Sequence, residues 1–343
     1  MPESLAGREV LVTGGLGFIG SNLVIQLVER GAKVTVLDRV SGEFGGRVDN
    51  LRDVSRAVAI VDGDVRNEAV LQELLPGKEV VFWLAAQVSH PLSMSDPLTD
   101  VDVNLRSQLQ MLEVCRRKAP TAKIVSTSTR QVYGRTTQHP VSESHPTSPV
   151  DVNGISKLAA EHCYRLYSEV YGLRTISFRL TNTYGPGMDL RSPGRGFINA
   201  CLSQALHGDP VTLFGTGEQT RDFTFVDDVV DALLLASVQK SDFGRTYNLS
   251  GPSPCSLKQF VMTLNQYLPV TVRTVPFPDE RLAIDVGNYW GDSTAWHQRT
   301  GWRANTKLED GLKRTVEYFL SHRECWEHSN VSSVPAKTDG RVR

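Results

Sequence analysis

The sequence predicts an α/β protein built on a doubly wound parallel sheet, with a second, smaller mixed domain, and three features indicate this fold. Several short segments are almost continuously apolar, which is typical of strands buried on both faces of a parallel sheet. Amphipathic segments with helical spacing alternate with them. A glycine-rich turn joins the first strand to the first helix, as in many folds of this class.

The expected elements alternate along the first half of the chain. Strands are expected at residues 10–12, 33–38, 57–61, 80–86, 122–129 and 174–181, and helices at 18–30, 67–75, 105–117 and from 149 onward. The last helix has the clearest start, because Ser148, Pro149 and Asp151 have the pattern of an N-cap, a first helical residue and a first-turn carboxylate. A helix that begins at Pro149 places Asn153 and Lys157 one turn apart on the same face.

Composition excludes several classes of protein. The 343 residues carry a formal net charge of -1, which argues against nucleic acid and anionic membranes as partners. There is no apolar run of the kind that forms a signal peptide or a membrane span. The five cysteines lack the Cys-x-x-Cys spacing of a zinc site and fit reduced thiols, so we expect no metal and a cytoplasmic location.

The glycine-rich turn has the spacing of a dinucleotide site. Gly14, Gly17 and Gly20 allow the backbone to approach a pyrophosphate at the start of the helix that Phe18 and Ile19 open. Asp38 ends the second strand, where its carboxylate can accept the ribose hydroxyls of an adenosine. It would repel a 2'-phosphate and therefore favours NAD, whereas Arg39 keeps NADP open. The alternative is a glycine turn without a ligand.

With these motifs, the sequence resembles the extended short-chain dehydrogenase/reductases that modify nucleotide sugars, from about Glu9 to Phe319. The resemblance implies a Rossmann domain that binds NAD. It assigns further cofactor contacts to the adenine loop, the end of the fourth strand, a structural asparagine and the catalytic lysine, which here are Asp64 and Val65, Leu84, Ala85 and Ala86, Asn104, and Lys157.

The same resemblance implies a nucleoside-diphosphate sugar as substrate. It places Thr129 against the reacting hydroxyl, and Asn182 and Arg221 against the diphosphate. A guanidinium fits phosphate oxygens in a bidentate manner, although Arg221 could instead pair with Asp222 or Asp227. The other expected substrate contacts are Gln87, Ser89, His90, Arg130 and Arg281.

The sequence departs from the family at two places. Where the family has Tyr-x-x-x-Lys, this chain has Asn153 and Lys157, and a carboxamide cannot serve as the base. Arg130 and Gln131 replace the Asp-Glu pair with which 4,6-dehydratases eliminate water. The second departure disfavours a dehydratase.

Three accounts follow from these departures. In the first, an epimerase uses a different proton relay made of Thr129, a water held by Asn153, and Lys157, with Tyr133 or His90 in reserve. For His90 alone, a role as a polar pocket or packing residue is favoured. In the second, a carbonyl or carboxylate of the substrate eases the reaction, as in a decarboxylase or dehydratase. In the third, the protein binds NAD and a nucleotide sugar without catalysis.

The expected domain boundaries interleave. The NAD-binding domain comprises residues 1–185 and about 221–250, and the substrate domain 186–220 and about 251–326. Residues 327–343 are polar and are expected to be a disordered tail. Family members commonly dimerise through two helices, so a homodimer is expected through residues 105–117 and 149–171.

Overall fold

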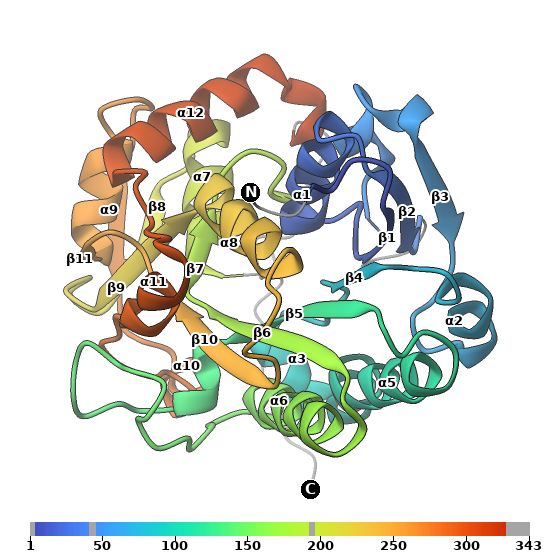
Figure 1. Cartoon of the computed structure of the whole chain (residues 1–343). Helices are drawn as coiled ribbons and strands as arrows, with labels where there is room; N and C mark the ends of the chain where they lie inside the picture. The colour runs from blue at the N-terminus through green and yellow to red at the C-terminus, as the bar shows by residue number, and fades with distance from the viewer. Residues whose placement is uncertain (1–3, 41–45, 192–195, 327–343) are drawn as a thin grey trace, which may run out of the picture.

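The computed structural model describes residues 4–40, 46–191 and 196–326, and its centre is a seven-stranded parallel sheet (Figure 1). The strand order is β10-β6-β5-β4-β1-β2-β3. The strands are β1 (Glu9–Thr13), β2 (Lys33–Asp38), β3 (Val58–Asp62), β4 (Val80–Trp83), β5 (Lys123–Thr129), β6 (Arg174–Leu180) and β10 (Arg245–Leu249). This order is that of a doubly wound Rossmann sheet, so the predicted fold class is confirmed.

Side chains alternate between two hydrophobic cores, one on each face of the sheet. Val10 and Val12 of β1 belong to one core, whereas Leu11, Val81 and Trp83 belong to the other. The strands read as continuous apolar runs because helices cover both faces. Figure 1 shows α1 and α8 on one side and α5 and α6 on the other. The covering helices are α1 (Phe18–Glu29), α2 (Glu68–Leu74), α5 (Ser107–Lys118), α6 (Val152–Tyr171) and α8 (Val226–Ser237).

A smaller part of mixed composition lies beside the large sheet. It holds a three-stranded sheet, β11-β9-β7, and a two-stranded sheet, β12-β8. These strands are β7 (Asn182–Tyr184), β8 (Val211–Phe214), β9 (Thr220–Phe225), β11 (Pro254–Ser256) and β12 (Val272–Val275). The domain boundaries stay a prediction, and the expected tail at 327–343 lies outside the described residues.

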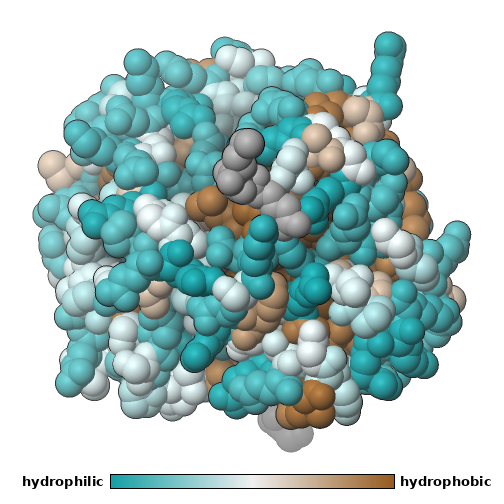
Figure 2. All heavy atoms as spheres, in the orientation of Figure 1, coloured by the Kyte–Doolittle hydropathy of each residue, from teal (hydrophilic) through white to brown (hydrophobic). Residues whose placement is uncertain are grey.

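The remaining helices connect these sheets. They are α3 (His90–Ser95), α4 (Pro97–Val101), α7 (Phe197–His207), α9 (Leu257–Leu264), α10 (Asp279–Ala283), α11 (Thr294–Thr300) and α12 (Leu308–Ser321). Short helical turns are η1 (Val48–Leu51), η2 (Ser55–Ala57), η3 (Asp102–Arg106), η4 (Arg130–Tyr133) and η6 (Arg323–Cys325). In the described part of the chain, no helix is both long and apolar enough to cross a membrane. Figure 2 shows a mainly hydrophilic face interrupted by small apolar patches.

The prediction that the helix after β5 begins at Pro149 with Ser148 as its cap is wrong. Helix α6 begins at Val152, and Asp151 is the N-cap, because its carboxylate accepts a hydrogen bond of 2.7 Å from the amide of Gly154. A capping carboxylate stabilises the positive end of the helix dipole more strongly than a hydroxyl. Lys157 and Asn153 still share one face, one turn apart.

Two other element boundaries, the end of β4 and the start of α5, differ from the prediction. Strand β4 ends at Trp83, and beyond it the amides of Leu84 and Ala85 both donate to the side-chain hydroxyl of Thr13. Helix α5 begins at Ser107 after a π-helical turn, η3, that contains the buried Asn104. Such turns often occur at functional positions.

Candidate functional site

The glycine turn between β1 and α1 is too crowded for side chains. Gly14 has a φ of +72°, and a Cβ there would lie 2.7 Å from the amide nitrogen of Ala85. A Cβ on Gly20 would lie 2.0 Å from the carbonyl oxygen of Gly14. Helix α1 starts after Gly17, and no side chain of the described residues caps it, which leaves its first amides able to bind an anion. The turn therefore fits the pyrophosphate of a dinucleotide.

Asp38 lies where a ribose-binding carboxylate is needed. Its two oxygens accept hydrogen bonds of 2.8 Å from the amides of Leu16 and Arg39. Burial raises the pKa of Asp38, and these backbone donors oppose that shift. The bond to Leu16 ties the carboxylate directly to the glycine turn. The Arg39 side chain itself is exposed.

The segment expected to form the adenine loop, at Asp64 and Val65, and the end of β4 lie on this side of the candidate site. Asp64 forms an ion pair of 2.7 Å with Arg66, and this guanidinium lowers the pKa of the carboxyl group despite burial. Val65 is buried beside it. The hydroxyl of Thr13 accepts from the amides of Leu84 and Ala85. Because β1 and β4 are neighbours at the point where the sheet order reverses, these segments border the crevice in which such folds bind ligands.

Asn153 belongs to a buried cluster of amides around one carboxylate. Gln87, Asn104 and Asn153 donate to the same oxygen of Asp100, over 2.9, 3.0 and 3.1 Å. Asn104 and Asn153 also both donate to the backbone carbonyl of Gln87, over 2.9 Å each. We call these four residues the Asp100 cluster. The amide nitrogen of Asn153 is therefore occupied by the protein.

Lys157 is buried one turn beyond Asn153. Its ammonium donates to the carbonyl oxygen of Thr127 over 3.2 Å. Burial lowers the pKa of Lys157 to about 8, although the carboxylates of Asp100 and Glu161 favour its charged form. Glu161 is in turn held by the forked guanidinium of Arg179, over 2.6 to 3.1 Å. A lysine with this pKa can hold a ribose hydroxyl and respond to mildly alkaline pH.

The hydroxyls near the end of β5 differ in their availability. Thr129 Oγ1 accepts from the amide of Gln131 over 3.2 Å, which leaves its proton able to bind a ligand. Tyr133 is buried, and its hydroxyl donates to Asn248 over 2.8 Å and accepts from Arg179 over 2.7 Å. As a reserve acid or base, Tyr133 is thus already committed to structural bonds.

His90 lies at the start of α3 and faces the start of α6. Its Nδ1 is 2.8 Å from a carboxylate oxygen of Asp151. Ser89, the residue before it, caps α3 by accepting from Leu92 over 3.3 Å. Gln131 donates to the same Asp151 oxygen over 3.1 Å. The polar segment 87–90 is therefore tied to both the Asp100 cluster and the N-cap of α6.

Two arginines form the predicted anion side of the site. Arg130 donates to Asn182 over 3.3 Å and lies over the ring of Tyr289. Its second terminal nitrogen, Nη1, is buried and has no hydrogen-bond partner among the described residues. Burial, and to a smaller extent the charge of Arg130, lowers the pKa of Arg221 to about 10. Two buried guanidinium groups that disfavour each other would be stabilised by a bound anion.

The alternative pairing of Arg221 with Asp222 or Asp227 is wrong, because Arg221 pairs with Asp285 over 3.2 Å. Asp227 pairs with Arg314, and Asp222 accepts from the amide of Gly291. Burial raises the pKa of Asp222 to about 6. Arg281 is exposed, and its guanidinium lies over the ring of Phe214.

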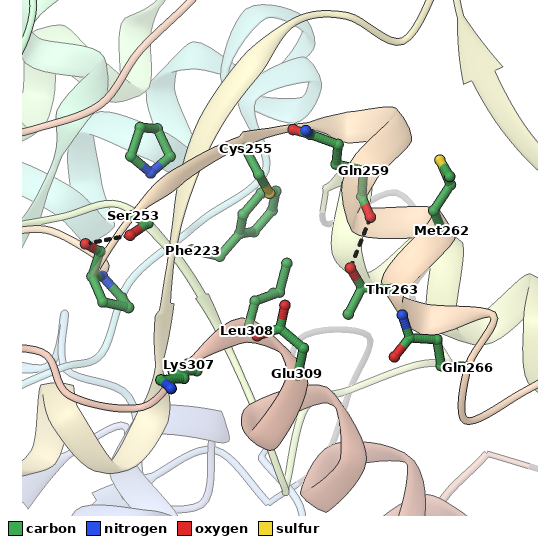
Figure 3. A pocket seen from close by; sticks show the side chains of 12 residues that line it. Phe223, Ser253, Cys255, Gln259, Met262, Thr263, Gln266, Lys307, Leu308 and Glu309 are labelled. Carbon is green, nitrogen blue, oxygen red and sulfur yellow. Dashed lines mark hydrogen bonds between the residues drawn. The ribbon is translucent and has the colours of Figure 1, made fainter.

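A separate hollow of about 560 Å³ lies between β11, α9 and the start of α12 (Figure 3). Cys255, Met262 and Glu309 are among its lining residues. None of the site residues expected from the sequence lines this hollow, so it is distinct from the crevice at the ends of β1, β4 and β5.

The sequence did not identify Asp100, Glu161 or the site role of Asp151. Asp100 precedes Asn104 by four residues and Glu161 follows Lys157 by four, which is the spacing of neighbours on a helix. That spacing was the available signal. The contact between His90 and Asp151 joins distant segments and has no local signal.

Residues 10–250 match the profile of the NAD dependent epimerase/dehydratase family. The UDP-glucose 4-epimerase of Mycolicibacterium smegmatis is 34% identical over 90% of this chain and 97% of its own length. The UDP-glucuronic acid decarboxylase 1 of Xenopus tropicalis is 30% identical over 98% of this chain and 77% of its own. A dTDP-glucose 4,6-dehydratase of Streptomyces venezuelae, solved with NAD bound, has a TM-score of 0.84 at 27% identity over 93% of this chain and 99% of its own.

Proposed function

Because this chain belongs to the NAD-dependent epimerase/dehydratase family, within the extended short-chain dehydrogenase/reductases, we propose that it is an epimerase of a nucleoside-diphosphate sugar. Relatives that epimerise, decarboxylate and dehydrate sugar nucleotides are all similar to it. The observation that carries the choice is the end of β5. Arg130 and Gln131 follow Thr129, and the side-chain amide of Gln131 donates a hydrogen bond to Asp151. These two positions therefore hold no carboxyl group that could eliminate water.

In this proposal NAD, when bound, would supply reversible hydride transfer at a ring carbon of the sugar, with return to the opposite face of the keto sugar. Asp38 holds the adenosine ribose and Lys157 the nicotinamide ribose. Thr129 orients the reacting hydroxyl, and Arg221 binds the diphosphate once it exchanges Asp285 for the phosphate oxygens. Asn153 acts as a positioning residue, because its amide nitrogen is bonded to Gln87 and Asp100.

A decarboxylase is the second candidate, and one feature favours it. Arg130 donates to Asn182 through Nη2, and its buried Nη1, which has no hydrogen-bond partner among the described residues, could receive a sugar carboxylate. Oxidation next to such a carboxylate eases loss of CO2, which would also reduce the need for a phenolic base. The class-level alternative is a protein that binds NAD and the nucleotide without turnover.

Product analysis separates these candidates. The protein with NAD is incubated with UDP-, dTDP-, GDP-, CDP- and ADP-sugars, uronates included, and the sugars are followed by NMR. We expect one sugar to be converted into its epimer without change of mass. Release of CO2 or water would replace the epimerase by a decarboxylase or a dehydratase. Unchanged sugars, despite tight binding of NAD and one nucleotide, would leave only the binding protein.

We also propose a homodimer in which α5 and α6 of each subunit pack together. Ile155, Leu166 and Val170 of α6 are each at least half exposed, which is unusual for three apolar side chains on one helix. Light scattering tests this proposal. Leu166→Glu should convert a dimer into a monomer, whereas Met262→Glu, at an exposed methionine of α9, should not. A wild-type monomer would contradict the dimer.

We place the protein in the cytoplasm, because its cysteines suit a reducing compartment. The described thiols of Cys115, Cys163, Cys201 and Cys255 are free. Burial raises the pKa of each of these thiols, which makes them poor nucleophiles.

A further inference from the structure

His90 and Asp151 lie as close together as an acid/base group and its orienting carboxylate. The Nδ1 atom of His90 is 2.8 Å from Asp151 Oδ2. The side chain of Asp151 is fully buried, whereas that of His90 is 36% exposed. One nitrogen of the imidazole thus faces the Asp151 carboxylate, and part of the ring is exposed to solvent.

Asp151 is held by two hydrogen-bond donors and by a close contact with His90. Its Oδ1 accepts from the amide of Gly154 over 2.7 Å and its Oδ2 from the side chain of Gln131 over 3.1 Å, and Nδ1 of His90 lies 2.8 Å from the same Oδ2 as an ion-pair contact. Burial by itself raises the pKa of Asp151, but His90, Gly154 and Gln131 together lower it. Because Asp151 is anionic, it selects the His90 tautomer that carries its proton on Nδ1. The Nε2 atom is then the proton acceptor.

The pair lies at the position that lacks a phenol. Asp151 is the N-cap of α6, Asn153 follows within the first turn, and Lys157 is one turn further on. His90 follows the segment 84–89, which borders the cofactor crevice after β4. Within the described residues, no hydrogen bond occupies Nε2 of His90, whereas Tyr133 and Asn153 have committed their donors to protein partners.

We propose that His90, oriented by Asp151, is the acid/base residue of this enzyme in place of the missing tyrosine, an assignment that rests on the proposed epimerase function. During oxidation the O–H bond of the sugar hydroxyl breaks and its proton passes to Nε2. The C–H hydride leaves to NAD+ as the C=O bond forms. Reduction returns both, so the imidazole is restored in each cycle. The Asp151 carboxylate stabilises the imidazolium between the two halves.

Other charged groups surround the pair and set its electrostatic environment. They are Asp96 and Asp100 at the two ends of α4, Lys157 on α6, and Arg130 on η4. Arg130 interacts electrostatically with Asp151, and Lys157 with Asp100. Among these charged groups and Asp151, only Asp151 is in direct contact with the His90 ring.

The first test needs no turnover. In protein with NAD bound, the 15N shifts of the His90 ring should show a proton on Nδ1 and none on Nε2 near neutral pH. Asp151→Asn retains a helix cap but should lose this tautomer preference. The same shifts in wild type and in Asp151→Asn would overturn the pairing.

The second test uses the sugar nucleotide that the product analysis identifies. His90→Gln should lower kcat by about 10²- to 10⁴-fold with KM little changed, and should abolish the acidic limb of the pH profile. Asp151→Asn should shift that limb to lower pH, which loss of a merely structural contact would not do. Added imidazole should partly rescue His90→Ala. His162→Gln, at an exposed histidine of α6, is the matched control.

The outcomes separate the two levels of the proposal. If His90→Gln keeps the wild-type kcat and acidic limb, His90 is not the acid/base residue, and the epimerase function stands. If the wild-type protein converts none of the sugars, the proposed function fails, and the 15N experiment still decides whether Asp151 orients His90.

Discussion

The glycine turn after β1 and the first turn of α6 face the same crevice, yet they are built in different ways. The glycine turn is defined by its backbone, because Gly14 and Gly20 leave no space for a Cβ. The first turn of α6 is defined by side chains, since Asp151 and Asn153 are bonded to residues from other segments. The first region keeps every position that the family resemblance requires, whereas the second has Asn153 where the resemblance implies a tyrosine.

This difference indicates which part of such a site can change. A pyrophosphate cradle of backbone amides has few alternatives, because any added atom displaces the chain. A proton can be taken by any group of suitable acidity at the right distance. The chemistry of α6 can therefore be reassigned to neighbours such as His90 while cofactor binding is preserved.

The largest expected effect follows removal of the charge of Lys157. In the proposed function this charge serves both cofactor binding and proton transfer. Lys157→Met should lower turnover by about 10²- to 10⁴-fold, because the ammonium orients the ribose and favours loss of the sugar proton. NAD affinity, measured by calorimetry, should fall less than about tenfold, since the other cofactor contacts persist. Lys313→Met, at an exposed lysine, serves as the control. Equal losses of turnover and NAD affinity would mean that the two regions do not act separately.

Addition of a single methyl group at Gly20 should disrupt the glycine turn. In Gly20→Ala the new Cβ would lie 2.0 Å from the Gly14 oxygen, so the turn must shift. We expect NAD affinity to fall by about 100-fold or more, measured by calorimetry on protein that circular dichroism shows to be folded. Gly172→Ala introduces the same methyl at a positive φ in open space and should leave NAD affinity unchanged. Unimpaired binding in Gly20→Ala would show that the turn is not the phosphate site.

Asn153→Ala tests the side-chain region without touching the cofactor turn. It removes one of three donors from Asp100, which should lower the free energy of unfolding by about 1 to 3 kcal/mol. Turnover should fall by about tenfold or more, and NAD affinity should be unchanged. Denaturant unfolding and calorimetry measure the two effects. Normal turnover with normal stability would make Asn153 a bystander.

The last expected effect is a pH dependence of stability. The pKa of Lys157 is about 8 in the folded protein, against an ordinary value of 10.5, so between these pH values the unfolded chain binds more protons. Stability relative to Lys157→Met should therefore rise with pH in this window, by up to about 3 kcal/mol. Urea unfolding of both proteins at pH 7 and pH 10 measures it. A falling difference would mean that Lys157 is stabilised in its charged form.

The fold was predictable because its determinants are local. Segments such as Val80–Trp83 are continuously apolar, and the glycine spacing marks the turn before α1. The start of α6 was misplaced because Ser148 and Asp151 are both good caps, and only the tertiary contacts of Asp151 with His90 and Gln131 decide between them. The Asp100 cluster joins residues 53 positions apart and was not predictable for the same reason.

The Asp100 cluster has a consequence for reversal of the substitution at position 153. Asn153→Tyr alone would restore the family residue but would remove a donor from both Asp100 and the Gln87 carbonyl. The phenol would also enter a space now filled by a small amide. The single change should therefore give a less stable protein than either the present chain or a relative that carries the tyrosine. Mutational routes between the two forms must therefore change several residues of the cluster together. We therefore expect the cluster to act as an epistatic barrier around the candidate site.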